Sequence, residues 1–345
     1  MSLACLPLYG LISLLGLTGL PVEAYGNGSA VVLTYHHVDS RTPESTSVSP
    51  DQFAEQLDYL IANSYKVWHL PDVIRRLKNG QHLPDKSVAI TFDDAYRSVY
   101  TAAWPLLRAH NLPFTVFVHT SAIGDSPGLH MSWAQLRELD KAGVEIGNHS
   151  HTHDHLPSKS VEEALADLGK AQEILEDKLN VQASTMAYPY GEFTPALVQW
   201  VNKQWTGFGQ HSGGVGPKNN LAALPRVPIS GQYASIEKFA QRINLHPLPL
   251  SAEPKNGLVT LIDQPEISLQ IPESIPNAQN IRCYASGQGL MDMTLLARTL
   301  TIRPKQPISA GRTKFNCTLK ATGTGYYWWS FLVMHPPDQN SWYTW

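Results

Sequence analysis

Short apolar runs alternate with longer amphipathic stretches between residues 31 and 245, and this alternation restricts the fold more than any other feature of the chain. The apolar runs are nearly continuous, as is typical of strands buried on both faces, and lie at 31–37, 87–94, 114–120, 144–150 and 184–190. Helical periodicity occurs at 50–64, 70–80, 96–110, 132–143 and 160–179, the last opening with Ser160 and Glu163 in capping-box spacing. Alternating strands and helices predict an α/β fold whose parallel sheet closes fully or partly into a barrel.

Titratable side chains gather where these expected strands end. Asp93 and Asp94 follow one strand, His36 and His37 end another, and a histidine-rich stretch begins at His149. Because the carboxyl ends of barrel strands meet on one face, we expect these groups to lie together. Adjacent carboxylates raise each other's pKa and cost free energy unless a cation or a proton separates their roles. The alternative is that one aspartate caps the following helix and the other is solvated.

A metal ion explains this pattern of residues. His149 and His153 are four residues apart, so both imidazoles can point at one ion, and one carboxylate completes a two-histidine, one-carboxylate site open to water. The other carboxylate is then free to act as a general base, and a histidine across the metal suits the general acid. His151 and His155 point elsewhere on the same turn and are expected beside the site or on the surface. The alternative for the whole run is a solvated histidine-rich loop.

The stretches TFDD (91–94), HSHTH (149–153) and YPYG (188–191) resemble the first three motifs of the polysaccharide deacetylases, the carbohydrate esterase family 4 with the NodB homology domain. The resemblance covers roughly residues 30–245. It implies a distorted (β/α)7 barrel that removes N-acetyl groups from N-acetylglucosamine polymers with a divalent metal, usually Zn²⁺ but also Co²⁺ or Ni²⁺.

The same resemblance assigns roles to individual residues. It makes Asp93 the base and assigns the metal to Asp94, His149 and His153. It also places the segment Pro189, Tyr190 and Gly191 along the substrate groove, with the Tyr190 backbone N–H helping to hold the oxyanion.

Two positions depart from the family pattern. The arginine that tethers the catalytic aspartate is replaced by Ala187, and Arg226 is our candidate for that tether. For the acid, the stretch TYHHV resembles exported poly-β-1,6-N-acetylglucosamine deacetylases, in which the acid histidine ends the first strand. This favours His36 as the acid, with His246 as the alternative. His37 points to the opposite side of an extended strand and is expected to be structural.

The pattern of apolar and polar residues changes after residue 246. Residues 256–345 contain short alternating segments separated by Gly, Pro and Asn, which predict an antiparallel β-sandwich accessory domain. The expected organisation is a signal peptide at 1–24, a catalytic domain at 25–246, a Pro-rich linker at 247–255 and the β-sandwich. Of the three cysteines, Cys5 lies in the signal peptide, so we expect Cys283 and Cys317 to form a disulfide in an oxidising compartment.

Composition limits the partners. Charged residues make up 16% of the chain and the formal net charge is −3, so the basic field required for nucleic-acid binding is absent. The N-terminal apolar run is too short for a stable transmembrane span, and we expect a secreted or periplasmic monomer that acts on a polysaccharide.

Other functions remain open from the sequence. One is an O-acetyl esterase that uses the same metal chemistry. Another is a non-catalytic carbohydrate-binding protein that uses aromatic side chains near the C-terminus, namely Tyr326, Tyr327, Trp328, Trp329, Trp342, Tyr343 and Trp345. Those in 326–331 are expected instead to alternate into the sandwich core, because a strand buries every second side chain.

Overall fold

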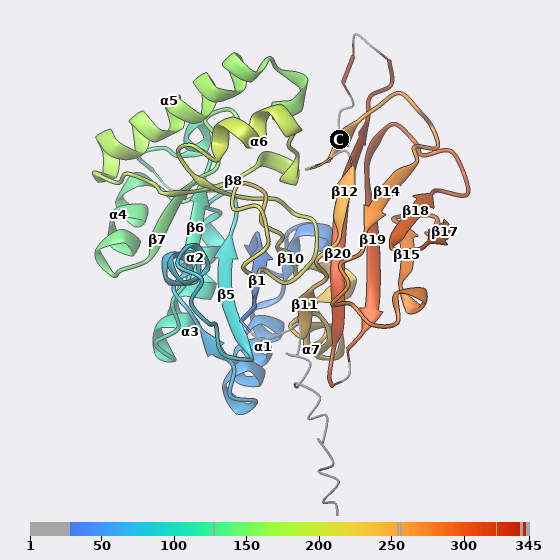
Figure 1. Ribbon diagram of the computed structural model, residues 1–345. Helices are drawn as coiled ribbons and strands as arrows, with labels where there is room; N and C mark the ends of the chain where they lie inside the picture. Colours follow the sequence, from blue (N-terminus) through green and yellow to red (C-terminus); the bar gives the residue numbers. More distant parts are fainter. Residues whose placement is uncertain are drawn as a thin grey trace, which may run out of the picture.

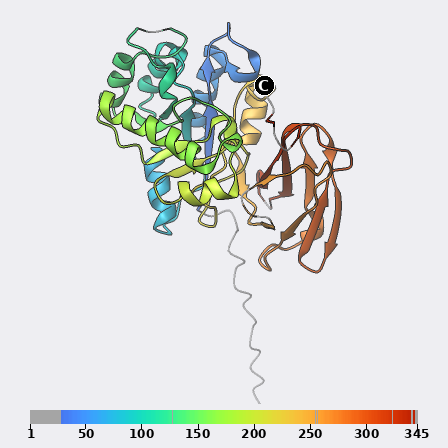
Figure 2. The ribbon, with the colours of Figure 1, turned by 90° about the horizontal axis from the view of Figure 1, so that it is seen from above.

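The computed structural model describes residues 28–126, 128–253, 255, 257–321, 323–338 and 341–342. The expected signal peptide, with Cys5, and the aromatic residues Tyr343 and Trp345 lie outside this range. The described chain has a helix-rich N-terminal part and a β-rich C-terminal part, which lie side by side (Figures 1 and 2).

An eight-stranded sheet forms the centre of the N-terminal part, and all its pairs are parallel. Its order is β10-β1-β5-β6-β7-β8-β9, with β4 also paired to β5. The strands are β1 (Ala30–Tyr35), β4 (Lys66–Val67), β5 (Ser87–Phe92), β6 (Thr115–Val118), β7 (Glu145–Asn148), β8 (Thr185–Ala187), β9 (Thr206–Phe208) and β10 (Val227–Pro228). The predicted parallel α/β sheet is therefore confirmed.

The two ends of this sheet approach each other without a direct β9–β10 pair. The Gly207 N–H in β9 donates to Leu221 O at 2.9 Å, and the Leu224 N–H donates back to Gly207 O at 2.8 Å. The segment that leads into β10 thus bridges the gap, and the sheet curves into a distorted, partly closed barrel. β9 and β10 were not identified from the sequence, because strands of two or three residues carry too little periodicity.

Helices pack around the sheet, and the first five occupy the expected ranges, whereas α6 and α7 were not expected. The helices are α1 (Pro50–Ala62), α2 (Leu70–Lys78), α3 (Trp104–Ala109), α4 (Trp133–Lys141), α5 (Val161–Leu179), α6 (Pro195–Val201) and α7 (Ile236–Arg242). The predicted capping box is confirmed, since Ser160 Oγ accepts from the Glu163 N–H and the Glu163 side chain accepts from the Ser160 N–H. The expected helix at 96–110 is interrupted by a π-helical turn at Val99–Ala103. None of the described helices is long and apolar enough to cross a membrane.

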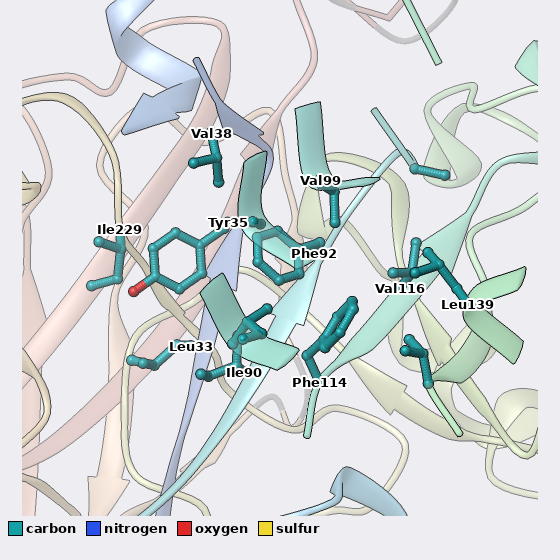
Figure 3. Close-up of a cluster of buried hydrophobic side chains, with 14 of the residues drawn as sticks. Leu33, Tyr35, Val38, Ile90, Phe92, Val99, Phe114, Val116, Leu139 and Ile229 are labelled. Carbon is teal, nitrogen blue, oxygen red and sulfur yellow. The ribbon is translucent and has the colours of Figure 1, made fainter. Parts of the chain in front are cut away.

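The main hydrophobic core lies between the sheet and these helices (Figure 3). Alternate residues of β1 and β5 enter it, including Leu33, Tyr35, Ile90 and Phe92. The Tyr35 hydroxyl is buried with them and donates to the Gln56 side-chain oxygen Oε1 at 2.8 Å, so its polar group is satisfied. This packing holds the ends of β1 and β5 rigidly, which is where the candidate site begins.

Two further sheets form the C-terminal part. One has the order β11-β20-β19-β15-β16 with β13 on β20, and the other has the order β12-β14-β18-β17. Their strands are β11 (Leu245–Pro247), β12 (Ser251–Glu253), β13 (Leu258–Val259), β14 (Ile267–Gln270), β15 (Arg282–Ala285), β16 (Gly289–Leu290), β17 (Asp292–Leu296), β18 (Thr299–Arg303), β19 (Gly311–Lys320) and β20 (Tyr326–His335). A small separate pair joins β2 (His37–Val38) to β3 (Ser47–Val48). Both large sheets contribute side chains to one hydrophobic cluster, among them Ile267, Ile302, Phe315 and Val333.

Two details differ from the expected C-terminal organisation. β11 and β13 pair with β20 in parallel, so this part is not purely antiparallel. The stretch at 247–255, expected to be a linker, contributes β12 and buries Leu248, Leu250 and Ala252 in the C-terminal cluster. These apolar residues alternate along the chain, and that spacing lets an extended segment bury one face. Cys283 and Cys317 form the expected disulfide between β15 and β19.

Candidate active site and metal centre

The candidate residues follow the carboxyl ends of neighbouring parallel strands. His36 follows β1, Asp93 and Asp94 follow β5, and His149 follows β7. The Pro189–Gly191 turn comes just after β8. Parallel pairing therefore brings these groups to one face of the barrel, as the sequence indicated.

Asp93 and Arg226 form a fully buried ion pair. The guanidinium donates two bonds, from Nη1 to Asp93 Oδ1 at 2.6 Å and from Nη2 to Asp93 Oδ2 at 2.8 Å. Neither side chain is exposed to solvent. Burial pushes the pKa of Asp93 upward, but the Arg226 charge and hydrogen bonds outweigh it and the net direction is downward. Asp93 is therefore held as a carboxylate, the form that a general base requires.

Asp94 and two histidines point their ligand atoms at one another. Asp94 Oδ1 lies 3.4 Å from His149 Nε2 and 3.2 Å from His153 Nε2. Among the described residues, neither Asp94 Oδ1 nor His149 Nε2 has a hydrogen-bond partner, although both atoms are buried. His149 Nδ1 lies 2.7 Å from Ala187 O, so it carries the proton and Nε2 presents a lone pair. This donor set fits a divalent metal ion of the zinc type.

Several of these residues adopt left-handed backbone conformations, which are uncommon outside glycine. The φ angle is 66° at Asp94, 58° at His153 and 57° at Tyr190. The loop after β7 is held in place locally, because Ser150 Oγ accepts from the His153 N–H at 2.9 Å. Strained backbone that the surroundings enforce is typical of functional sites.

His119 is a neighbouring residue that the sequence reasoning missed. It follows β6, and its ring can place a nitrogen within 4.8 Å of ligand atoms of Asp94 and His153. Both of its ring nitrogens are buried without a hydrogen-bond partner among the described residues, and burial lowers its pKa to about 3. The strand-end rule that singled out His149 applies equally to this position, so the signal was available.

The two candidate acids differ in their surroundings. His36 Nε2 lies 3.9 Å from Asp93 Oδ2. His246 lies in β11, where its ring packs on Tyr327, and the acidic group that acts on it is Asp85, which precedes β5. Because Asp93 follows β5, His246 lies toward the opposite end of that strand, and this geometry disfavours it as the acid.

His37, expected to be structural, stacks on Tyr96 with ring centroids 3.6 Å apart. The other two histidines of the run are anchored. His151 Nδ1 lies 2.9 Å from Thr120 Oγ1, and His155 Nδ1 lies 2.7 Å from the buried Glu192 carboxylate. The His155 ring also stacks on Tyr190, with centroids 4.1 Å apart, and so supports the Pro189–Gly191 turn.

Gln210 is a second residue that the sequence reasoning missed, because β9 was not identified. Its side-chain amide donates to Asp93 Oδ2 at 3.4 Å. Gly191, with φ of 71°, packs against it, and a Cβ at position 191 would lie 2.4 Å from Gln210 N. Glycine is therefore required where the YPYG turn meets the segment after β9.

The aromatic residues of β20 divide between the two parts of the protein. Tyr327 and Trp329 pack against the C-terminal cluster, Phe331 belongs to it, and Trp328 packs against the main N-terminal core. Most of their surface is therefore used in packing, and Tyr326 is the more exposed member at 46%.

Comparison with known proteins agrees with this geometry. Residues 80–205 match the family model described as polysaccharide deacetylase. Poly-beta-1,6-N-acetyl-D-glucosamine N-deacetylase of Staphylococcus aureus is 28% identical over 235 residues, which is 60% of this chain and 80% of that protein. The protein of the same name from Staphylococcus epidermidis is 27% identical over 235 residues, 60% of this chain and 81% of its own.

Solved structures show the same fold. IcaB from Ammonifex degensii superimposes with a TM-score of 0.55 at 27% identity, over 62% of this chain and 96% of its own. The Streptococcus pyogenes deacetylase PplD, solved with acetate, has a TM-score of 0.58 at 24% identity, over 63% of this chain and 99% of its own. Residues 80–205 therefore match the polysaccharide deacetylase family model, and the N-terminal part of the chain has the fold of these solved deacetylases.

Proposed function

We propose that this protein is a metal-dependent N-deacetylase that removes acetyl groups from an N-acetylglucosamine polysaccharide. The observation that carries the proposal is the placement of a buried, arginine-paired Asp93 beside the converging ligand atoms of Asp94, His149 and His153. A carboxylate that only capped a helix would not need a fully buried bidentate partner.

Each residue has a defined task in this reaction. A divalent metal held by Asp94, His149 and His153 would supply Lewis acidity, which lowers the pKa of water and favours negative charge on the acetamide oxygen. Asp93 accepts the proton of the attacking water. We assign to the Tyr190 backbone N–H the role of hydrogen-bond donor to the same oxyanion.

His36 then donates a proton to the departing amine. Burial lowers its pKa, so it is mostly neutral near pH 7 before the reaction. Its Nε2 is 3.9 Å from Asp93 Oδ2, and a small movement lets it receive the proton that Asp93 took from water. The amide and one water thus become an amine and acetic acid, which then ionises to acetate and a proton in solution, with no net gain or loss of protons by Asp93 and His36.

The names of the relatives support a proposal about the polymer. The curated proteins that match at 27–28% identity are named for poly-β-1,6-linked N-acetylglucosamine. We infer the same linkage here, with Zn²⁺ as the metal and the C-terminal sheets as a β-sandwich accessory domain. A polymer of this kind lies outside the cytosol, in keeping with the Cys283–Cys317 disulfide and with secretion or periplasmic export by residues 1–24.

The test is acetate release from β-1,6- and β-1,4-linked N-acetylglucosamine oligomers by the purified protein, with chelator and with zinc added back. We expect chelator-sensitive release that is faster on the β-1,6 oligomers. Release from O-acetylated but not N-acetylated oligomers would favour the esterase, and no release would favour the binding protein. Asp93→Asn should abolish release yet still bind one zinc ion, because Asp94, His149 and His153 remain.

The ligand set has its own test. We expect His149→Ala to weaken zinc binding by about 100-fold or more, because it removes a ligand whose second nitrogen is already anchored to Ala187 O. His119→Ala should weaken binding by less than about tenfold. Isothermal titration of the metal-free variants with zinc measures both. The reverse order would assign the third ligand position to His119.

A further inference from the structure

The segment that follows β9, residues 209–212, contacts the candidate base and its arginine. Gly209 O accepts from Arg226 Nε at 2.9 Å, and the Gln210 amide donates to Asp93 Oδ2 at 3.4 Å. The backbone N–H of Arg226 in turn donates to His211 O at 3.0 Å. The segment therefore holds both members of the buried ion pair.

Two side chains of the C-terminal part donate hydrogen bonds to the same segment. Lys314 Nζ, from β19, donates to Gln210 O at 2.7 Å. Ser330 Oγ, from the neighbouring strand β20, donates to Ser212 O at 2.7 Å. β19 and β20 are paired along ten residues each, so these two donors are fixed relative to one another.

Lysine is not the side chain expected at position 314 if this contact only held the two parts of the protein together. Its side chain is mostly buried, and burial together with the nearby Arg312 and Arg242 charges lowers its pKa to about 7. Burying an amine costs free energy unless the amine is hydrogen-bonded. Lys314 donates its hydrogen bond to the backbone oxygen of Gln210, and the side chain of Gln210 contacts Asp93.

The position of Gln210 leaves it little freedom. Gly191 packs directly on its backbone on one side, and a Cβ at 191 would approach Gln210 N to 2.4 Å. Lys314 holds its carbonyl, and its amide faces the Asp93 carboxylate. A shift of the carbonyl therefore moves the amide relative to Asp93.

We propose that Lys314 is a positioning residue of the active site, which acts through Gln210 to orient the Asp93 carboxylate, so that the C-terminal part completes the catalytic centre. This inference rests on the proposed deacetylase function for its kinetic test. It goes beyond that function because it assigns a role in the reaction to the accessory sheets.

A double-mutant cycle tests the inference in the full-length zinc-loaded protein. The variants are Lys314→Met, Gln210→Ala and the double variant, with Lys320→Met as the matched control from the exposed end of the same strand. We expect Gln210→Ala to lower kcat by about tenfold, Lys314→Met by about three- to tenfold, and the double variant no further than Gln210→Ala alone. KM and zinc content should stay within about twofold of the wild type, and Lys320→Met should behave as the wild type.

A merely structural role for Lys314 predicts a different result. Its effect on kcat would then multiply with that of Gln210→Ala, and this outcome, or an unchanged kcat in Lys314→Met, would overturn the inference. If Lys314→Met fails to fold, Ser330→Ala replaces it in the cycle with the same expected coupling, because it removes the second bond to the segment.

A readout without substrate separates this inference from the proposed function. We expect hydrogen exchange of the 209–216 peptide to rise in Lys314→Met and not in Lys320→Met. If the wild type releases no acetate but exchange rises in this way, the proposed function is wrong, and the role of Lys314 in fixing the segment is supported. If the wild type is active and exchange does not change, that role of Lys314 is wrong and the deacetylase function is supported.

Discussion

At the residue scale, the charges of the site are arranged around Asp93. The family pattern supplies its arginine from the position occupied here by Ala187, and Arg226 makes the bidentate pair instead. Arg226 directly precedes β10, and its guanidinium lies 5.2 Å from the Phe117 ring centroid inside the barrel. Ala187 keeps a different task, because its backbone oxygen orients His149. The ion pair with Asp93 therefore requires a guanidinium at this position in the barrel, and the arginine can come from a different strand.

Arg226→Met should lower the free energy of unfolding by about 3–5 kcal/mol, because it leaves the Asp93 charge buried without its partner. Urea denaturation followed by circular dichroism measures this. The double variant Asp93→Asn/Arg226→Met should recover part of the loss, since the uncompensated charge is gone. Equal or larger destabilisation of the double variant would mean that Arg226 stabilises the fold through other contacts, such as its bond to Gly209 O.

At the element scale, the long strands β19 and β20 serve both parts of the molecule. They form the middle of the larger C-terminal sheet and also send Lys314 and Ser330 to the segment after β9. β20 divides its aromatic side chains in the same way, with Trp328 against the N-terminal core and Trp329 against the C-terminal cluster. Two faces of one strand thus pack against two cores.

This burial predicts a pH dependence of stability. Lys314 has a pKa of about 7 in the folded protein and about 10.5 when unfolded, so between these values the unfolded chain binds more protons. Its contribution to the unfolding free energy therefore rises with pH from about 7 toward 10, by at most about 1.4 kcal/mol per pH unit. In urea titrations at pH 6, 7.5 and 9, the difference between Lys314→Met and wild type should favour the variant at pH 6 and shrink as pH rises. A difference that is constant with pH would contradict the buried charge.

At the scale of the whole molecule, the two parts share elements instead of being joined by a linker. β11 follows the last helix of the N-terminal part, and Leu245 belongs to the main core, yet β11 pairs with β20 of the C-terminal sheet. The Tyr326 N–H also donates to Asn244 O at 3.2 Å. Removing the C-terminal part would therefore strip hydrogen bonds and apolar cover from the N-terminal part.

A chain that ends at Pro247 should accordingly melt about 10 °C or more below the full-length protein and bind more of a hydrophobic dye. Its kcat should fall by at least about tenfold, because Gln210 and Ser212 lose the donors from β19 and β20. Thermal melts and acetate release measure these effects against full-length Lys320→Met. A truncated chain with full kcat and an unchanged melting temperature would show that the C-terminal sheets are only appended.

The sequence by itself determined the parallel α/β architecture, the first five helices with the capping box at Ser160 and Glu163, the paired cysteines and the cluster of Asp93, Asp94, His149 and His153 at strand ends. These follow from local periodicity and from the rule that carboxyl ends of parallel strands share a face, and both can be read along the chain. The tertiary structure alone decided which groups surround that cluster. His119 and Gln210 are brought there by β6 and β9, and Lys314 comes from a strand more than a hundred residues after Gln210 along the chain. Such contacts depend on how strands are ordered and how two sheets meet, and short strands such as β9 and β10 leave no periodic signal from which to predict it.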